Sequence, residues 1–210
     1  MARSAPLTRG FFDRPTLEVA RDLLGKVLVH HRRGALTSGA IVEVEAYIGE
    51  SDPACHAAPG PTRRNAPLYG PPGLAYVYLN YGIHALVNAV TEPAGSPAAV
   101  LIRALDPIDG VGIMRRRRRR AMKGRRGTTT GLALVDLCRG PGNLTMAMGI
   151  TLEENGANLS GRRLWIEDRG VGMTAAAWGP RIGIRVGTDR PWRAWIPGHP
   201  AVSGRRARPS

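Results

Sequence analysis

The chain has 210 residues, which fits one good-sized domain able to bury a core without disulfide or metal staples. It holds 30 Lys and Arg residues against 16 Asp and Glu, and the formal net charge of +14 favours a polyanionic partner, nucleic acid before a membrane surface. Two cysteines, Cys55 and Cys138, exclude a disulfide framework and a four-cysteine zinc site, and no run approaches the ~20 apolar residues that span a bilayer. We therefore expect a soluble, unexported protein of a reducing cytoplasm.

The first predicted elements are a basic arm, a helix and a hairpin. We expect residues 1–10 to form a flexible arm. The stretch "DRPTLEVARDLLGK" predicts a helix, because Asp13 is a candidate N-cap, Pro15 fits a first turn and Gly25 is a typical stop. The strand pattern of "KVLVHH", the turn "RRGA" and the strand pattern of "LTSGAIVEVEAYI" together predict a β-hairpin.

The second arm of this hairpin, within "IVEVEAYIGESDPACH", runs into a proline-interrupted turn. Side chains alternate along a strand, so Glu43, Glu45 and Tyr47 share one face and the apolar residues between them pack inward. A solvated outer face is the ordinary explanation of such glutamates. The stretch by itself leaves that explanation and a functional site both open.

A loop and a second hairpin come next. "APGPTRRNAPLYGPPG" is too rich in proline and glycine for a regular element. Its Arg63-Arg64-Asn65 triplet suits phosphate contact, although a basic surface loop explains such a triplet more often. "LAYVYLNYGIHALVNAV" then predicts a hairpin with Tyr76 and Tyr78 on one strand face and an aromatic residue at its tip.

The second half of the chain holds a strand, an arginine-rich segment and a short helix. "AAVLIRALDP" predicts a strand whose single arginine, Arg103, needs a partner, and Glu45 is a candidate. Residues 115–130 are expected to form a mobile loop, either a phosphate-binding flap or a solvated insertion. "GPGNLTMAMGI" predicts a short helix whose amino end is open to anions. Short strands and turns follow, and residues 204–210 are expected to be a disordered tail.

Several kinds of site lack their motif in this chain. There is no His-x-x-x-His or Cys-x-x-Cys pattern for a metal, and "GPPG" and "GPGN" lack the spacing and the lysine of a phosphate loop. What remains is a carboxylate at Glu45, several aromatics and imidazoles, and a basic envelope. An enzyme that extrudes a nucleobase needs faces to stack the base and charge to hold the backbone. An ordinary aromatic core under a basic surface gives the same pattern.

Five stretches, in order, resemble the alkyladenine (3-methyladenine) DNA glycosylase family, in the manner of its bacterial-type members. They are "IVEVEAYIGESDPACH", "TRRNAPLYGPPGLAYVYLNYGIHALVNAV", "VLIRALDP", "LCRGPGNL" and "RIGI", and the resemblance runs from about Phe11 to Pro200. It implies an α+β fold over residues 11–203, a single mixed catalytic domain with a curved, mainly antiparallel β-sheet and β-hairpins flanked by short helices.

The resemblance also implies roles for particular residues. Glu45 matches the general base that deprotonates the attacking water, and Arg103 and the backbone amide of Ile182 match the groups that hold this water. Tyr81 matches the wedge that enters the duplex where the target nucleotide leaves. The pocket for the flipped base is implied to contain Tyr47, Ala54, His56, Tyr78 and Asn88, with Asn88 excluding guanine. Further contacts with DNA are expected at Ile83, His84, Arg64 and Asn65.

The implied activity is hydrolysis of the N-glycosidic bond of damaged purines in double-stranded DNA: alkylated purines, hypoxanthine and etheno adducts. No cofactor and no metal is expected, and the protein is expected to act as a monomer on the cytoplasmic nucleoid. A glycosylase that also cuts the strand needs an amine, and the only lysines are Lys26 and Lys123. We therefore expect a monofunctional enzyme that leaves an abasic site.

Two departures and two alternatives accompany this prediction. Residues 115–120 are more basic than the family pattern, and His84 stands where vertebrate-like members carry an aromatic residue. A non-catalytic RNA-binding module would also use a basic domain with exposed aromatics. A nucleoid-associated structural protein would bind DNA with an affinity set by salt alone.

Overall fold

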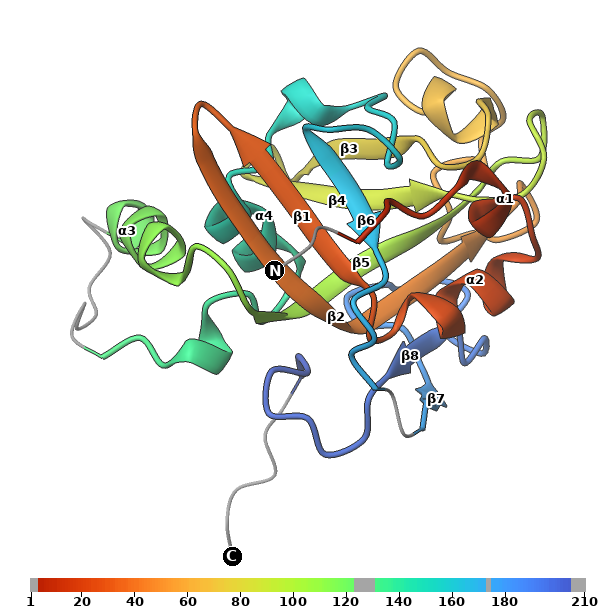
Figure 1. The fold of residues 1–210 in the computed structure, drawn as a ribbon. Helices are drawn as coiled ribbons and strands as arrows, with labels where there is room; N and C mark the ends of the chain where they lie inside the picture. The colour runs from red at the N-terminus through yellow and green to blue at the C-terminus, as the bar shows by residue number, and fades with distance from the viewer. Residues whose placement is uncertain (1–3, 123–130, 173–174, 205–210) are drawn as a thin grey trace, which may run out of the picture.

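The computed structural model describes residues 4–122, 131–172 and 175–204. Its centre is a curved antiparallel sheet with the strand order β3-β4-β5-β2-β1-β6, to which β8 adds through β2 and β7 through β8 (Figure 1). The strands are β1 Val27–Arg32, β2 Ala35–Ile48, β3 Ala75–Asn80, β4 His84–Val90, β5 Ala98–Pro107, β6 Leu164–Glu167, β7 Ala177–Gly179 and β8 Arg193–Trp195. The predicted α+β class, with its antiparallel sheet and two hairpins, is confirmed.

Strand β2 is the centre of this sheet. It pairs with β1, β5 and β8, and its middle residues are buried on both faces. At Gly39 the strand comes close to β5, because a Cβ there would lie 2.9 Å from the Asp106 carbonyl oxygen. A strand covered on both faces places its polar side chains inside the protein, where each needs a partner.

Helices cover the sheet and close the hydrophobic core. α2 Thr16–Leu23 packs on β2 and β5, α1 Arg9–Phe12 contacts α2, and α4 Pro141–Met148 packs on β4. Leu23 and Val19 of α2 are fully buried in a core shared with Leu144 of α4. The first helix prediction is confirmed in place, but α2 begins after Pro15 rather than at an Asp13 cap. Short 3-10 turns complete the fold at η1 Ala66–Tyr69, η2 Leu134–Asp136 and η3 Leu152–Glu154.

The amino-terminal arm corrects one expectation. Within residues 4–10, the Leu7 amide donates to the Ile166 carbonyl at 2.7 Å, and Pro6 bridges to Glu167 of β6. Ser160 donates its hydroxyl to the Leu7 carbonyl at 2.6 Å. This part of the arm is therefore bound to the edge strand β6, which would otherwise expose unpaired backbone groups.

The arginine-rich segment corrects a second expectation. Residues 115–122, predicted as loop, belong to α3 Val111–Met122, which stands out to one side of the sheet (Figure 1). Arg115 donates to the Leu132 carbonyl, Arg117 donates to the Ala147 and Met148 carbonyls, and Arg118 is only 6% exposed. Acceptors at the carboxyl end of α4 offset the repulsion between neighbouring arginines, as expected for a cation at a helix C-terminus. The rest of the predicted loop, 123–130, and the tail from 205 lie outside the described residues.

No helix among the described residues has the length and apolar character needed to cross a membrane.

Candidate active site

A pair of register irregularities between β2 and β5 shapes the site. Ile41 faces Leu105 and Glu43 faces Ala104, so Val42 has no counterpart across this ladder. Val44 then faces Ile102, which leaves Arg103 as the extra residue on β5. Bulges of this kind re-aim a side chain and are frequent beside active sites.

The re-aimed Arg103 lies between two buried carboxylates. Its Nε donates to Glu43 Oε1 at 3.1 Å, and its Nη1 forms an ion pair with Glu45 Oε2 at 3.1 Å. Glu43 and Glu45 have no exposed area, and Arg103 is 6% exposed. The predicted Glu45 partner for Arg103 is confirmed, and the solvated outer face is wrong. Glu43 is a second partner, which the sequence signals only by its place two residues earlier on the same face.

The two glutamates have different surroundings. Glu43 accepts from the Ser203 amide at 2.6 Å, from the Ser203 hydroxyl at 2.9 Å and from Arg193 at 3.1 Å. Glu45 accepts from the Ile182 amide at 2.6 Å through Oε1 and from the Tyr47 hydroxyl at 2.8 Å through Oε2. Glu43 is therefore held in place by its donors and in turn fixes Arg103. The donors to Glu45, in contrast, are residues that line a cavity.

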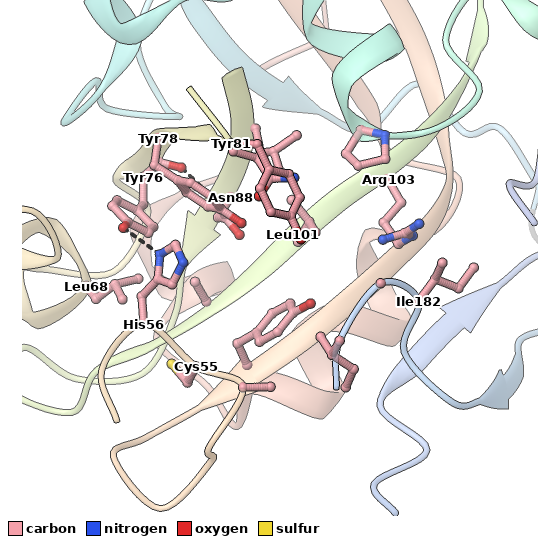
Figure 2. Close-up of a pocket in the computed structure, with 18 residues that line it drawn as sticks. Cys55, His56, Leu68, Tyr76, Tyr78, Tyr81, Asn88, Leu101, Arg103 and Ile182 are labelled. Atoms are coloured by element: carbon pink, nitrogen blue, oxygen red, sulfur yellow. Dashed lines mark hydrogen bonds between the residues drawn. The ribbon is translucent and has the colours of Figure 1, made fainter. Parts of the chain in front are cut away.

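This main cavity has a volume of about 390 Å³ and is lined mostly by aromatic and apolar side chains from β2, β3, β4 and β5 (Figure 2). The predicted pocket residues come together here, and so do Arg103 and Ile182, the predicted neighbours of Glu45. The lining comprises Tyr47, Ala54, Cys55, His56, Leu68, Tyr76, Tyr78, Asn80, Tyr81, Leu86, Asn88, Ala99, Leu101, Arg103, Pro141, Ile182, Gly183 and Ile184.

Three rings form one wall of the main cavity. Tyr76 and Tyr78 are stacked with their centroids 5.3 Å apart and their planes inclined by 30°, and His56 meets Tyr78 edge-on at 4.4 Å. His56 Nδ1 is 2.8 Å from the Tyr76 hydroxyl (Figure 2). Burial, with a further contribution from Arg64, lowers the pKa of His56 and favours a neutral imidazole at pH 7.

Two tyrosine hydroxyls at the cavity, those of Tyr47 and Tyr78, keep their protons. Burial, and after it the charge of Glu45, raises the pKa of Tyr47 above its usual range. Burial, Tyr76 and then Glu45 raise the pKa of Tyr78 in the same direction. Tyr47 is therefore a hydrogen-bond donor to Glu45 throughout the neutral pH range.

Asn88 closes the inner side of the cavity. It is 4% exposed and donates to the Tyr76 carbonyl at 2.9 Å, which fixes the amide in place. It lies opposite Tyr76 on β3 and Leu101 on β5, so its backbone is paired on both sides within the sheet. The buried, hydrogen-bonded amide therefore has little freedom to move away from a bulky ligand.

Asn65, for which a DNA contact is predicted, is a buried residue. It is 2% exposed, and its amide donates to the His56 and Gly60 carbonyls at 2.8 and 2.9 Å. Its Oδ1 accepts from the Thr62 amide at 2.6 Å. The Asn65 side chain is therefore fully used in holding the loop that carries His56.

The tip of the second hairpin protrudes next to the cavity. Tyr81 is 87% exposed in a left-handed conformation with φ of +48°, and Ile83 is 65% exposed. His84 is half-buried against Gly142 of α4, where a Cβ would lie 2.9 Å from the imidazole. Arg64 lies beside Tyr78, with its guanidinium carbon 5.6 Å from the ring centroid. The predicted position of Tyr81 at an exposed tip is confirmed.

The cysteine thiols and possible metal ligands are further candidate reactive groups. Burial raises the pKa of Cys55 to about 11 and that of Cys138 to about 12, so neither thiol is a ready nucleophile at neutral pH. Within residues 4–122, 131–172 and 175–204, no group of three His, Cys, Asp or Glu side chains is arranged to hold a metal ion.

An aromatic cavity with a carboxylate behind its wall, in a basic protein, is suited to holding one base and hydrolysing its bond to the sugar. The class of enzyme that this fold and site define is the DNA glycosylase, a hydrolase of N-glycosidic bonds.

Comparison with known proteins gives the particular family. The family model for methylpurine-DNA glycosylase (MPG) matches residues 10–200. A protein of Chlorobium phaeobacteroides named "Putative 3-methyladenine DNA glycosylase" is 48% identical over 204 residues, covering 96% of each chain. Proteins with the same name from Methanocella arvoryzae and Burkholderia lata are 48% and 46% identical, covering 95% of this chain and 96% and 92% of theirs. The chain belongs to the methylpurine-DNA glycosylase family.

Proposed function

We propose that this enzyme removes 3-methyladenine and related damaged purines from duplex DNA by flipping the base into the main cavity and hydrolysing its glycosidic bond. One observation carries the proposal: Glu45 is fully buried directly behind Tyr47, Arg103 and Ile182, and all three of these line the cavity. A carboxylate held in this way faces the position where the sugar of a bound nucleotide would lie.

Glu45 is arranged to activate a water molecule. A carboxylate offers about four lone-pair sites; Ile182 and Tyr47 donate to two of them, and the ion pair with Arg103 takes up a third. The remaining site suits an O–H of the attacking water, whose proton passes to Glu45 as the bond to C1′ forms. The negative charge of the carboxylate also stabilises the oxocarbenium-like sugar that forms as the base departs.

The cavity suits a flat, electron-poor ring. Tyr47, His56 and Tyr78 all line the cavity and supply aromatic rings, and an alkylated purine stacks well on such rings. Damaged bases are also cheaper to extrude because they pair weakly. The fixed amide of Asn88 would crowd the exocyclic amine of a normal guanine. Hypoxanthine and etheno adducts fit the same contacts and complete the proposed substrate class.

The proposed enzyme cleaves only the base. Lys26 forms an ion pair with Asp168 at the start of β1, away from the residues that line the cavity. The other lysine, Lys123, lies outside the described residues. A Schiff base with the sugar requires an amine at the reaction centre, and none of the described lining residues supplies one.

The test is base release from duplex oligonucleotides that carry a single hypoxanthine or ethenoadenine. Release is scored as strand scission after alkali, for the wild type, Glu45→Gln and the exposed-site control Glu50→Gln. We expect scission only after alkali, its loss in Glu45→Gln with DNA affinity kept, and full activity in Glu50→Gln. Tight binding without release by the wild type would instead support an RNA-binding or nucleoid protein, and scission without alkali would contradict the monofunctional mechanism.

A further inference from the structure

A buried arginine lies behind the main cavity. Arg181 immediately precedes Ile182, and its side chain has no exposed area. Its guanidinium carbon is 4.7 Å from the centroid of the Tyr47 ring and 5.3 Å from that of Trp192. Arg181 does not line the cavity, so it backs the face of Tyr47 that is turned away from a bound base.

The charge of Arg181 is matched by Asp52, which is also fully buried. The two side chains form a bidentate pair, with Nη1 to Oδ2 at 2.5 Å and Nη2 to Oδ1 at 2.8 Å. Asp52 also accepts from the Ala54 amide at 3.2 Å and the Ile48 amide at 3.4 Å. The pair therefore joins the end of β2, the turn that carries Ala54 and the segment that carries Ile182.

Further contacts hold the guanidinium in one orientation. Arg181 donates to the Ala46 carbonyl at 3.0 Å and to the Gly187 carbonyl at 3.1 Å. A Cβ at Gly187 would lie 3.0 Å from Arg181 Nη2, so the backbone at Gly187 packs closely against the ion pair and leaves little room for a side chain. Ala46 stands between Glu45 and Tyr47, which ties Arg181 to the backbone of the catalytic strand.

We propose that Asp52 and Arg181 are positioning residues for base release: together they fix the Tyr47 ring and the Ile182 amide, the two groups that hold Glu45 besides Arg103. This inference rests on the proposed function. One rigid pair would thereby set both the stacking face for the base and the orientation of the carboxylate. An error in either would misplace the attacking water relative to C1′, and small displacements of reacting groups reduce rates strongly.

Stability alone is a weak explanation for this pair. A buried ion pair loses most of its attraction to desolvation, and a well-packed apolar pair often serves folding as well. Among the described residues, no group accepts a hydrogen bond from the buried Arg181 Nε, which is a further cost to folding. An apolar pair, however, would supply neither the bidentate tie between the two segments nor the flat cation behind Tyr47.

The test uses single-turnover release of hypoxanthine from a duplex that carries one such base. The variants are Asp52→Asn, Arg181→Met and Arg181→Lys, with Glu45→Gln as a reference. The control is Glu154→Gln, which neutralises another fully buried carboxylate that pairs with an arginine, away from the cavity. Thermal melting establishes that each variant is folded at the assay temperature.

We expect the rate constant to fall about 10- to 100-fold in Asp52→Asn and Arg181→Met, with an intermediate loss in Arg181→Lys, which keeps the charge but not the fork. Affinity for a duplex with a tetrahydrofuran abasic-site analogue should stay within about threefold, because that probe has no base to stack on Tyr47. Glu154→Gln should keep the wild-type rate. Should Arg181→Met fail to fold, the two milder substitutions decide the question.

The failures are distinguishable. The proposed function stands if the wild type releases base and Glu45→Gln does not. The positioning role is nevertheless refuted if the folded Asp52 and Arg181 variants keep the wild-type rate or lose no more of it than Glu154→Gln does. Equal losses of rate and of affinity for the abasic analogue would also refute it, because they would indicate general damage to the protein. If the wild type releases no base, the proposed function fails and the positioning role falls with it.

Discussion

Two neighbouring arginines of α3 should have different roles: replacing one should reduce stability, and replacing the other should weaken the salt dependence of DNA binding. Arg117 is half-buried and donates Nη1 to the Ala147 carbonyl at 3.0 Å and the Met148 carbonyl at 2.6 Å, at the carboxyl end of α4. Arg116, one residue earlier, is exposed. Changing each in turn to glutamine therefore compares a structural arginine with a surface arginine in one helix.

The magnitude follows from these contacts. A hydrogen bond from a charged donor contributes about 1.5–3 kcal/mol, and a cation at a helix C-terminus about 0.3–1 kcal/mol. With partial solvent screening, we expect Arg117→Gln to lower the free energy of unfolding by about 2–3 kcal/mol, and Arg116→Gln by under about 0.5 kcal/mol. For a domain of this size the first loss corresponds to a fall in Tm of about 4–12 °C.

Urea denaturation and thermal melting measure these losses of stability. The salt dependence of DNA binding should show the reverse order, with a larger effect from the exposed arginine than from Arg117. Arg116, Arg119 and Arg120 are the exposed arginines of α3, and we expect them to contact phosphates. Each such contact removed should reduce the slope of log K against log salt by about 0.9, whereas Arg117→Gln should leave the slope unchanged. Equal stability losses in Arg116→Gln and Arg117→Gln would refute the division of the helix into an inner and an outer face.

Three further outcomes are expected. Gly149→Ala should lower the free energy of unfolding by about 1–2 kcal/mol, because Gly149 has a left-handed φ of +75°. The loss should be smaller in an Arg117→Gln background, because the added Cβ would lie 2.6 Å from the Arg117 guanidinium carbon. Urea denaturation of Gly149→Ala with and without Arg117→Gln tests this non-additivity. Burial lowers the pKa of His30 and outweighs its contacts with Met148 and Glu154, which raise it. The unfolded chain therefore takes up a proton at this position first as the pH falls, and the stability of the folded protein should decrease below about pH 6.5. The urea midpoint of His30→Gln should depend less on pH than that of the wild type. Tyr81→Ser should slow base release far more than it weakens binding to undamaged duplex, and equal losses would reduce Tyr81 to a surface contact.

Local patterns were sufficient for the hairpins and the exposed aromatic tip. The period-two alternation of "AYVYLN" places Tyr76 and Tyr78 on one face, and their rings do lie together. The Asn-Tyr-Gly turn fixes where the chain reverses, which puts Tyr81 in solvent. These features depend on residues within a few positions of one another, so a single sequence contains them.

The features that sequence reasoning missed depend on distant segments. Arg181 and Asp52 are 129 residues apart, and no local signal connects them. Ser203, which encloses Glu43, is 160 residues from it. The arginine-rich segment was misassigned for the same reason: its charges repel one another locally, and the carbonyl acceptors that hold them in a helix lie on α4.

The paired bulges at Val42 and Arg103 limit how the length of this chain can change. Each is an extra residue in its own strand, and together they restore the register before Glu45 is reached. Deleting either one alone would shift one strand by a single position, and such a shift turns every following side chain to the opposite face. Glu45 would then exchange places with an apolar neighbour. A change of length that keeps the site intact must therefore occur in both strands at once, so an insertion or deletion between residues 41 and 45 should require a matching one between residues 102 and 105.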